Sequence, residues 1–305
     1  MLQTPVAVFI FNRPHCTEQL VHALAFVRPA RLFVIADGPR NDCEIEICEQ
    51  TRAIIDQIDW PCTILKRYAT SNIGCRESIP NGLNWVFQHV DTCIILEDDC
   101  IPQPSFFPFC QELLSRYKYD MRIMTIGGHR SDGPNELDTE SYYFSKYPSI
   151  WGWATWKEKW AKYDLNMSQW DDLKNSNWLN KILKSPKAVA YWSRMYDHMK
   201  NGLDTWDYAL AYSCWLHKGL SIRSRVNMIS NIGFGKEATH THKTEMADIY
   251  ANPMDIEFPL KHPIAISIDK EIDDRIEWVS FSGMDERRLQ IVREYIYISR
   301  ADEGS

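Results

Sequence analysis

The sequence predicts an α/β fold in which a mixed, mainly parallel sheet is flanked by helices. Short apolar segments rich in β-branched residues alternate with segments whose apolar residues recur at helical spacing, which is typical of β-α-β units. Continuous apolar strands of this kind are usually buried in a sheet that is covered by helices. The expected strands are 6–11, 31–37, 62–67 and 92–98, and the expected helices between them are 17–26, 44–58 and 76–89.

The same pattern divides the chain into three parts. Residues 1–119 carry the regular alternation and are expected to bind a nucleotide, because ligands bind at the carboxyl ends of the strands in open sheets of this kind. Residues 120–250 contain a tryptophan-rich segment and helical patterns at 187–201 and 205–218, and are expected to complete the same domain and to receive a second substrate. Residues 251–305 are mixed and charged, and are expected to form a loosely attached helical extension.

Composition excludes several classes of protein. A net charge of -7 with scattered basic residues argues against nucleic acid as a partner. The nine cysteines form no CxxC pair, which indicates a reducing compartment. Neither a basic leader nor an apolar stretch of membrane-spanning length occurs in the sequence. We therefore expect a cytoplasmic chain, which could touch the inner face of a membrane peripherally.

Three consecutive acids, Glu97, Asp98 and Asp99, stand at the end of the last expected strand, directly after its apolar run. Adjacent carboxylates repel one another, so they either face water or share a cation. A solvated turn is the ordinary explanation of such a triplet. The position at a strand's carboxyl end favours a shared cation instead. Mg²⁺ or Mn²⁺ can be held by few carboxylates when phosphate oxygens and water complete its coordination shell.

Two more polar residues follow neighbouring strands. Arg13 comes after the first strand and Asp37 ends the second, so both are expected at the same edge of the sheet, where they could bind a nucleobase or a ribose. Asp37 precedes Gly38 and Pro39, and a simple turn explains that tripeptide equally well.

The order and the local sequences of the motifs resemble those of the nucleotide-diphospho-sugar glycosyltransferases of the GT-A fold. The similarity covers roughly residues 4–245, and within that fold the chain is similar to bacterial family-two-like transferases and to N-acetylglucosaminyltransferase I. The motifs that carry the resemblance are VFIFNRP, VIADGP, NIGCRESIPNGLNWVF, ILEDDCIPQPSFFPF, YPSIWGWATWKEKW, TWDYALAY and SNIGFGKEATHTH.

The resemblance implies roles for the residues of these motifs. It identifies the triplet with the DXD element of the family, in which Asp99 would bind Mn²⁺ or Mg²⁺ and Asp98 the ribose, with Glu97 as a third member near the sugar. Arg13, Asp37 and Arg76 join Asp98 as expected contacts of the nucleotide.

The tryptophan-rich segment WGWATWKEKW has two interpretations. Its indoles partly follow helical spacing and could be core. Gly152, however, would let the backbone approach a ligand, and an aromatic face suits a sugar ring. The resemblance places Gly152 and Trp153 beside the donor and acceptor sugars, whereas Trp156 and Trp160 are expected to be packing residues.

An inverting sugar transfer needs a base that deprotonates the acceptor hydroxyl. The segment LDTWDYALAY offers Asp204 and Asp207, and Asp204 is the natural cap of the helix that follows. The resemblance identifies Asp207 as the base and places Trp206 against the acceptor sugar. Tyr208 stands where the relative has a second acid.

The segment GFGKEATHTHKTE combines glycines with polar residues, which is the composition of a mobile lid or of a solvated loop. Lys236 could offset the charge of a diphosphate, and a histidine could bind the metal or the diphosphate. The resemblance assigns these contacts to Thr239 and His240, with His242 as the other choice for the metal.

These observations favour a metal-dependent, inverting glycosyltransferase. It would move a sugar from a nucleotide-diphosphate donor, a UDP sugar by preference, to a glycan or lipid-linked glycan in bacterial surface polysaccharide synthesis. A sugar nucleotidyltransferase is the rival enzyme, although the segment NRPHCTEQL lacks the glycine-rich loop that usually binds a triphosphate. A non-catalytic glycan- or nucleotide-binding protein on a transferase scaffold is the third alternative.

Overall fold

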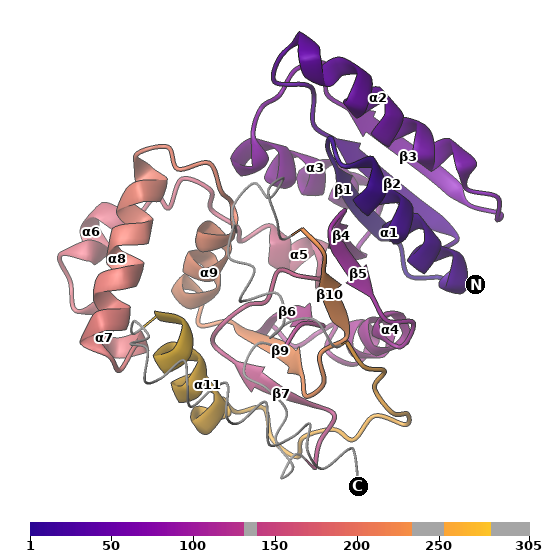
Figure 1. Cartoon of the computed structure of the whole chain (residues 1–305). Coiled ribbons are helices and arrows are strands. Elements are labelled where there is room, and N and C mark those ends of the chain that lie inside the picture. The colour runs from indigo at the N-terminus through magenta and orange to yellow at the C-terminus, as the bar shows by residue number, and fades with distance from the viewer. Residues whose placement is uncertain (131–138, 234–252, 282–305) are drawn as a thin grey trace, which may run out of the picture.

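The computed structural model describes residues 1–130, 139–233 and 253–281. Its centre is an eight-stranded sheet with the order β3-β2-β1-β4-β8-β6-β9-β7 (Figure 1). β1 pairs in parallel with β2 and β4, β2 with β3, and β6 with β9, whereas β8 and β7 run antiparallel to their neighbours. The strands are β1 (Val6–Ile10), β2 (Arg31–Ala36), β3 (Thr63–Tyr68), β4 (Thr92–Glu97), β6 (Ile123–Gly127), β7 (Tyr142–Ser145), β8 (Trp153–Trp156) and β9 (Leu220–Ser224).

The predicted mixed sheet flanked by helices is confirmed. The helices expected in the first half are α1 (Pro14–Val27), α2 (Ile45–Ile54) and α3 (Cys75–His89). Those expected in the second half are α8 (Pro186–Lys200) and α9 (Asp207–Leu216). The other helices are α4 (Phe106–Arg116), α5 (Lys157–Trp160), α6 (Trp170–Lys174), α7 (Trp178–Ile182) and α11 (Lys270–Ile276), with short helical turns at η1 (Asp42–Glu44), η2 (Ile55–Gln57) and η3 (Glu277–Phe281).

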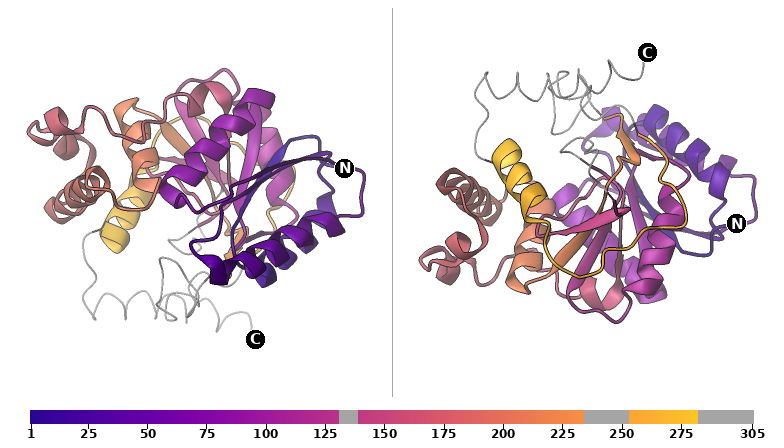
Figure 2. Two further views of the ribbon diagram at one scale, coloured as in Figure 1. Left: turned by 90° about the horizontal axis from the view of Figure 1, so that it is seen from above. Right: turned by 90° about the horizontal axis from the view of Figure 1, so that it is seen from below.

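The two faces of the sheet bury different sets of residues, because successive side chains of a strand point to opposite sides. Val6 and Val8 of β1 join a core with residues of α1 and α4, whereas Ala7 and Phe9 join a second core with residues of α3, α8 and α9. Helices α6, α7 and α8 lie at the opposite end of the molecule from α1 and α2 (Figures 1 and 2). The main sheet continues from the first predicted half into the second, because β4 pairs with β8.

A two-stranded ribbon, β5 (Cys100–Pro102) with β10 (Ile229–Asn231), lies beside the main sheet. β5 begins directly after the acid triplet, and β10 leads into the segment in which a lid was predicted. The ribbon therefore brings residues that are about 130 positions apart in sequence to the same end of β4.

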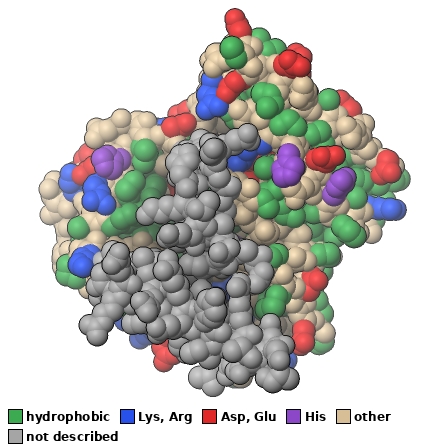
Figure 3. Space-filling model, viewed as in Figure 1, with side chains coloured by type: hydrophobic (Ala, Val, Ile, Leu, Met, Phe, Trp, Pro, Cys, Tyr) green, Lys and Arg blue, Asp and Glu red, His purple; other side chains and the backbone are tan. Residues whose placement is uncertain are grey.

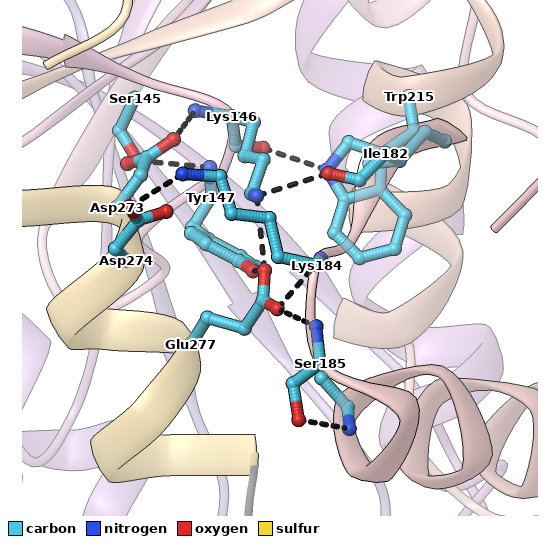
Figure 4. Close-up of polar contacts among 11 residues, drawn as sticks. Ser145, Lys146, Tyr147, Ile182, Lys184, Ser185, Trp215, Asp273, Asp274 and Glu277 are labelled. Carbon is cyan, nitrogen blue, oxygen red and sulfur yellow. Dashed lines mark hydrogen bonds and ion pairs between the residues drawn. The ribbon is translucent and has the colours of Figure 1, made fainter. Parts of the chain in front are cut away.

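The expectation of a loosely attached extension is wrong for residues 253–281. The carboxylate of Asp273 on α11 accepts hydrogen bonds from Ser145 Oγ (2.5 Å) and Lys146 N (2.9 Å). Glu277 pairs with Lys146 Nζ at 3.0 Å and accepts from Tyr147 Oη at 2.9 Å (Figure 4). Charged residues suggested a surface helix, but here they bind it to the body.

In the described part of the chain, no helix is both long enough and apolar enough to cross a bilayer.

Candidate active site

A cavity of about 560 Å³ opens at the carboxyl ends of β1, β2 and β4. The first turns of α3 and α9 also contribute to its wall, so the cavity is bounded by both halves of the chain. Seven residues to which the sequence assigned a place at the site line it, namely Arg13, Asp37, Glu97, Asp98, Asp99, Trp206 and Asp207. On the face of the molecule shown in Figure 3, basic and acidic side chains of the described residues are intermixed.

Arg13 supplies a positive charge to the acid triplet. Its guanidinium pairs with Asp98 through Nη2 and lies 2.9 Å from Asp99 Oδ2 through Nη1. Burial opposes the charge of Arg13, but Asp98 and Asp99 outweigh it and hold its pKa well above the ordinary value. The repulsion within the triplet is thus offset in part by the chain itself.

The triplet remains short of positive charge. Burial, together with the negative charges of Asp99 and Asp98, raises the pKa of Glu97 to about 8. Burial also raises the pKa of Asp98 to about 6, although Arg13 works against that rise. Glu97 therefore holds a proton at neutral pH, which is how a crowded acid cluster avoids a third negative charge.

The donor set suits a divalent cation only if the substrate completes it. Across residues 1–130, 139–233 and 253–281, no three Asp, Glu, His or Cys side chains are arranged to hold a metal ion. Both Asp98 and Asp99 pair with Arg13, but Asp99 keeps 16% of its side chain exposed at the cavity, against 3% for Asp98. Mg²⁺ is often held by one or two carboxylates with phosphate oxygens and water as the remaining ligands. Asp99 with Glu97 beside it fits that arrangement.

The chain that leads into the predicted lid packs directly on the triplet. Ile232 N donates to the backbone oxygen of Asp99 at 2.9 Å. A Cβ on Gly233 would lie 2.1 Å from Asp99 Oδ2 and 2.9 Å from Arg13 Nη1, so only glycine fits there without a shift. Lys236, Thr239, His240 and His242 lie outside the described residues, and their roles stay predictions.

Asp37 acts as a clamp on the loop before α3. Its carboxylate accepts from the backbone nitrogens of Gly38 (2.8 Å), Ile73 (3.0 Å) and Gly74 (3.0 Å), and from Asn72 Nδ2 (3.1 Å). Burial raises its pKa in spite of these bonds. The carboxylate lines the cavity, and its oxygens already accept hydrogen bonds from this loop.

Arg76 and Asp204 meet at the start of α3. Asp204 does not cap the helix that follows it, because α9 begins three residues later and is preceded by Trp206. Its Oδ1 instead accepts from Arg76 N at 2.9 Å, in the first turn of α3. The guanidinium of Arg76 donates to Met199 O at 2.9 Å and is not part of the cavity lining formed by the described residues. A structural role of Asp204 is thus supported, with a different helix as its partner.

Asp207 is the first residue of α9 and faces the cavity. It accepts a hydrogen bond from Thr205 Oγ1, and a negative charge is favourable at this end of a helix. Its charge contributes to the raised pKa of Glu97, so the two carboxyl groups interact across the cavity. The carboxylate of Asp207 and the cluster of Arg13 with the three acids therefore face the same cavity.

The structure corrects the placement of Gly152 and Trp153. Trp153 is 1% exposed and stacks on Trp206 with 5.6 Å between ring centroids. A Cβ on Gly152 (φ +61°) would lie 2.3 Å from Ile229 Cδ1, so its close neighbour is the β10 ribbon. Neither residue is among the described lining residues, where Trp151 stands in their place. Trp156 and Trp160 are buried packing residues, as predicted.

Sequence reasoning missed several residues of the cavity wall. Arg223 on β9 and His129 are buried and line it, and burial with the charge of Arg223 lowers the pKa of His129 to about 3. Aromatic residues of α8 and η3 also line it, among them Tyr191 and Phe281. No motif marks these positions; only the apolar stripe of α8 gave a signal, and that stripe is equally typical of a core helix.

The sequence matches no family model and no curated protein. A solved structure of UDP-glucose pyrophosphorylase with UDP-glucose is similar at a TM-score of 0.39 and 10% identity, over 73% of this chain and 90% of that chain. Mouse xyloside xylosyltransferase 1 gives 0.38 and 9%, over 72% and 84%. The 4-diphosphocytidyl-2C-methyl-D-erythritol synthase from Anaerococcus prevotii gives 0.35 and 8%, over 81% and 96%.

Proposed function

We propose that the chain is an inverting glycosyltransferase that uses a nucleotide-diphosphate sugar, a UDP sugar by preference. One observation carries the proposal: a single cavity joins the Arg13-acid cluster at the ends of β1 and β4 to the carboxylate of Asp207 at the start of α9. The first group suits a nucleotide diphosphate at the usual edge of an open sheet. The second provides a base that is separate from the nucleotide contacts.

The donor would bind along the ends of the parallel strands. Mn²⁺ or Mg²⁺ would be held by Asp99, with Glu97 next to it, and would offset the charge of the leaving diphosphate. Asp98 holds Arg13 in place and is the proposed contact of the ribose. Lys236, Thr239 and His240 are proposed to close over the diphosphate from the segment that starts beside Asp99.

Asp207 would act on the acceptor. Its carboxylate accepts the proton of an acceptor hydroxyl while that oxygen forms a bond to the anomeric carbon. The bond from this carbon to the diphosphate breaks on the opposite face, and the nucleotide leaves with the electron pair, so the configuration inverts. Thr205 orients the carboxylate through its hydroxyl. The acceptor is proposed to be a glycan or lipid-linked glycan of bacterial surface polysaccharide synthesis, in the cytoplasm or at the inner membrane face.

A sugar nucleotidyltransferase is the second candidate, because a basic side chain, Arg13, stands in the cavity directly after β1. Such enzymes use a basic residue near this place to bind a triphosphate. Here that side chain is engaged by Asp98 and Asp99, which leaves it less able to bind phosphate. The glycosyltransferase is therefore the preferred function.

One pair of assays separates the candidates. The protein is incubated with UDP, GDP and dTDP sugars and Mn²⁺, and nucleoside diphosphate is measured with and without saccharide acceptors. In parallel, pyrophosphate is added and nucleoside triphosphate is measured. We expect diphosphate release that acceptors accelerate. Triphosphate formed from pyrophosphate and a nucleotide sugar would identify the nucleotidyltransferase instead, and nucleotide binding without either product would identify a binding protein.

A further inference from the structure

Part of the cavity wall is built from five aromatic residues of four different segments. We refer to them as the aromatic wall: Tyr147, Tyr191, Trp192, Tyr208 and Phe281. Phe281 is at their centre, with ring centroids 5.3 Å from Tyr147, 5.3 Å from Tyr191 and 4.9 Å from Trp192. The rings come from the segment after β7, from α8, from α9 and from η3, so tertiary structure alone brings them together.

The aromatic wall combines apolar faces with hydroxyl groups at the cavity. Tyr147 and Trp192 are nearly buried and back the wall, whereas Tyr191, Tyr208 and Phe281 are partly exposed. The hydroxyl groups of Tyr191 and Tyr208 are 2.6 Å apart, and Tyr208 is next to Asp207 in sequence. Burial raises the pKa of both phenols, so they remain protonated and can donate hydrogen bonds at neutral pH.

The position of Phe281 is fixed by buried polar contacts rather than by a free tail. Glu277, at the start of the same π-helical turn, accepts from Ser185 N at 2.6 Å, just before α8 (Figure 4). The same carboxylate pairs with Lys146 Nζ beside Tyr147. Glu277 thus connects the segments that contribute Tyr147, Tyr191 and Phe281 through its hydrogen bond and its ion pair. π-helical turns are rare and occur frequently at functional sites.

We propose that the aromatic wall is a binding site for a pyranose ring. A pyranose has an apolar face of C–H groups and a rim of hydroxyls, which match the partly exposed rings and the adjacent phenol pair. The wall adjoins Asp207, so a sugar bound there would present a hydroxyl toward that carboxylate. This assignment of the site to the acceptor rests on the proposed glycosyltransferase function. Binding of a pyranose does not rest on it.

The test measures binding without any donor. Saturation-transfer NMR is recorded for the full-length protein with methyl glycosides of glucose, galactose, mannose and N-acetylglucosamine, and with octanol as an apolar probe without a sugar. Phe281→Ala and Tyr191→Ala are compared with Trp278→Ala, which changes an aromatic residue of the same turn that is outside the described cavity lining. The melting temperature of each variant reports whether it is folded. The increase of this temperature on adding UDP and Mn²⁺ reports whether the variant still binds the nucleotide.

We expect at least one glycoside to bind, and Phe281→Ala and Tyr191→Ala to weaken it by roughly five- to tenfold, as for loss of one aromatic contact. Trp278→Ala should stay within about twofold, and the response to UDP should be unchanged in all folded variants. The proposal is wrong if no glycoside binds, or if octanol binds and none of the glycosides does. It is also wrong if both alanine variants bind the glycosides with the affinity of the wild type. If UDP sugars do not bind, the proposed glycosyltransferase function is wrong. The glycoside titrations would still decide whether the aromatic wall binds a pyranose.

Discussion

Replacing Glu97 with glutamine should make the free energy of unfolding less dependent on pH. In the folded chain the pKa of Glu97 is raised from 4.5 to about 8 by burial and by the charges of Asp99 and Asp98. Between these two values the folded protein keeps a proton that the unfolded chain has lost. Stability therefore falls as the pH rises from about 4.5 to about 8, and it stays reduced above that range.

The size of the effect follows from the same two values. A pKa difference from 4.5 to about 8 would correspond to about 5 kcal/mol if Glu97 were wholly shielded from water. Glu97 keeps partial contact with the cavity, where solvent screens its neighbours. We therefore expect Glu97→Gln to remove roughly 2 kcal/mol of the pH-dependent loss. Part of the loss should persist, because Asp98 and Asp273 also have pKa values raised to about 6.

Urea unfolding of the wild type and of Glu97→Gln at about pH 5 and about pH 8.5 measures this difference directly. The buffers contain EDTA, because a bound divalent cation would itself lower the pKa of Glu97. Glu18→Gln changes an exposed glutamate on α1 and should follow the wild type. If wild type and Glu97→Gln lose stability in parallel across this range, Glu97 is ionised in the folded protein and the reasoning is wrong.

Three further variants test the site. Asp207→Asn should lower turnover by roughly a hundredfold to ten-thousandfold and leave UDP binding intact; normal turnover would exclude it as the base. Asp204→Ala should lower the free energy of unfolding by about 1 kcal/mol, because α3 loses the carboxylate at its first turn, and an unchanged denaturation midpoint would contradict this. Asp99→Asn should abolish the gain in UDP affinity on adding Mn²⁺ in calorimetry, whereas a gain equal to that of the wild type would rule out Asp99 as a ligand.

The regular alternation of the first hundred residues carried enough information to predict four of the eight strands of the main sheet, β1 to β4. Buried parallel strands are apolar along most of their length, so segments such as 31–37 and 92–98 can be recognised as strands from sequence. The acid triplet could be located because three acidic residues directly after a buried apolar run mark the end of the strand. Asp207 was found through its motif, and the structure places it at the same cavity.

Contacts between distant segments left no comparable signal. Asp204 caps α3, a helix about 130 residues earlier in the chain, and local sequence suggested only the helix that follows it. Gly152 interrupts the alternation before β8 with a positive φ, so sequence could not decide which indole faces the cavity. Asp273 and Glu277 looked like surface charges, because the partners that bury them, Ser145 and Lys146, lie far away in sequence.

The charges of the cluster give a reason for a divalent cation that does not depend on any resemblance. The pKa of Glu97, raised to about 8, keeps that group protonated at neutral pH, and the single guanidinium of Arg13 faces two further carboxyl groups, those of Asp98 and Asp99. Asp207 adds another across the cavity. A nucleotide diphosphate would meet repulsion from these carboxyl groups unless a cation came with it, because its phosphates carry charge of the same sign. Arg13 pairs with Asp98 and Asp99, so we expect Mn²⁺ or Mg²⁺ to accompany a diphosphate that binds beside them.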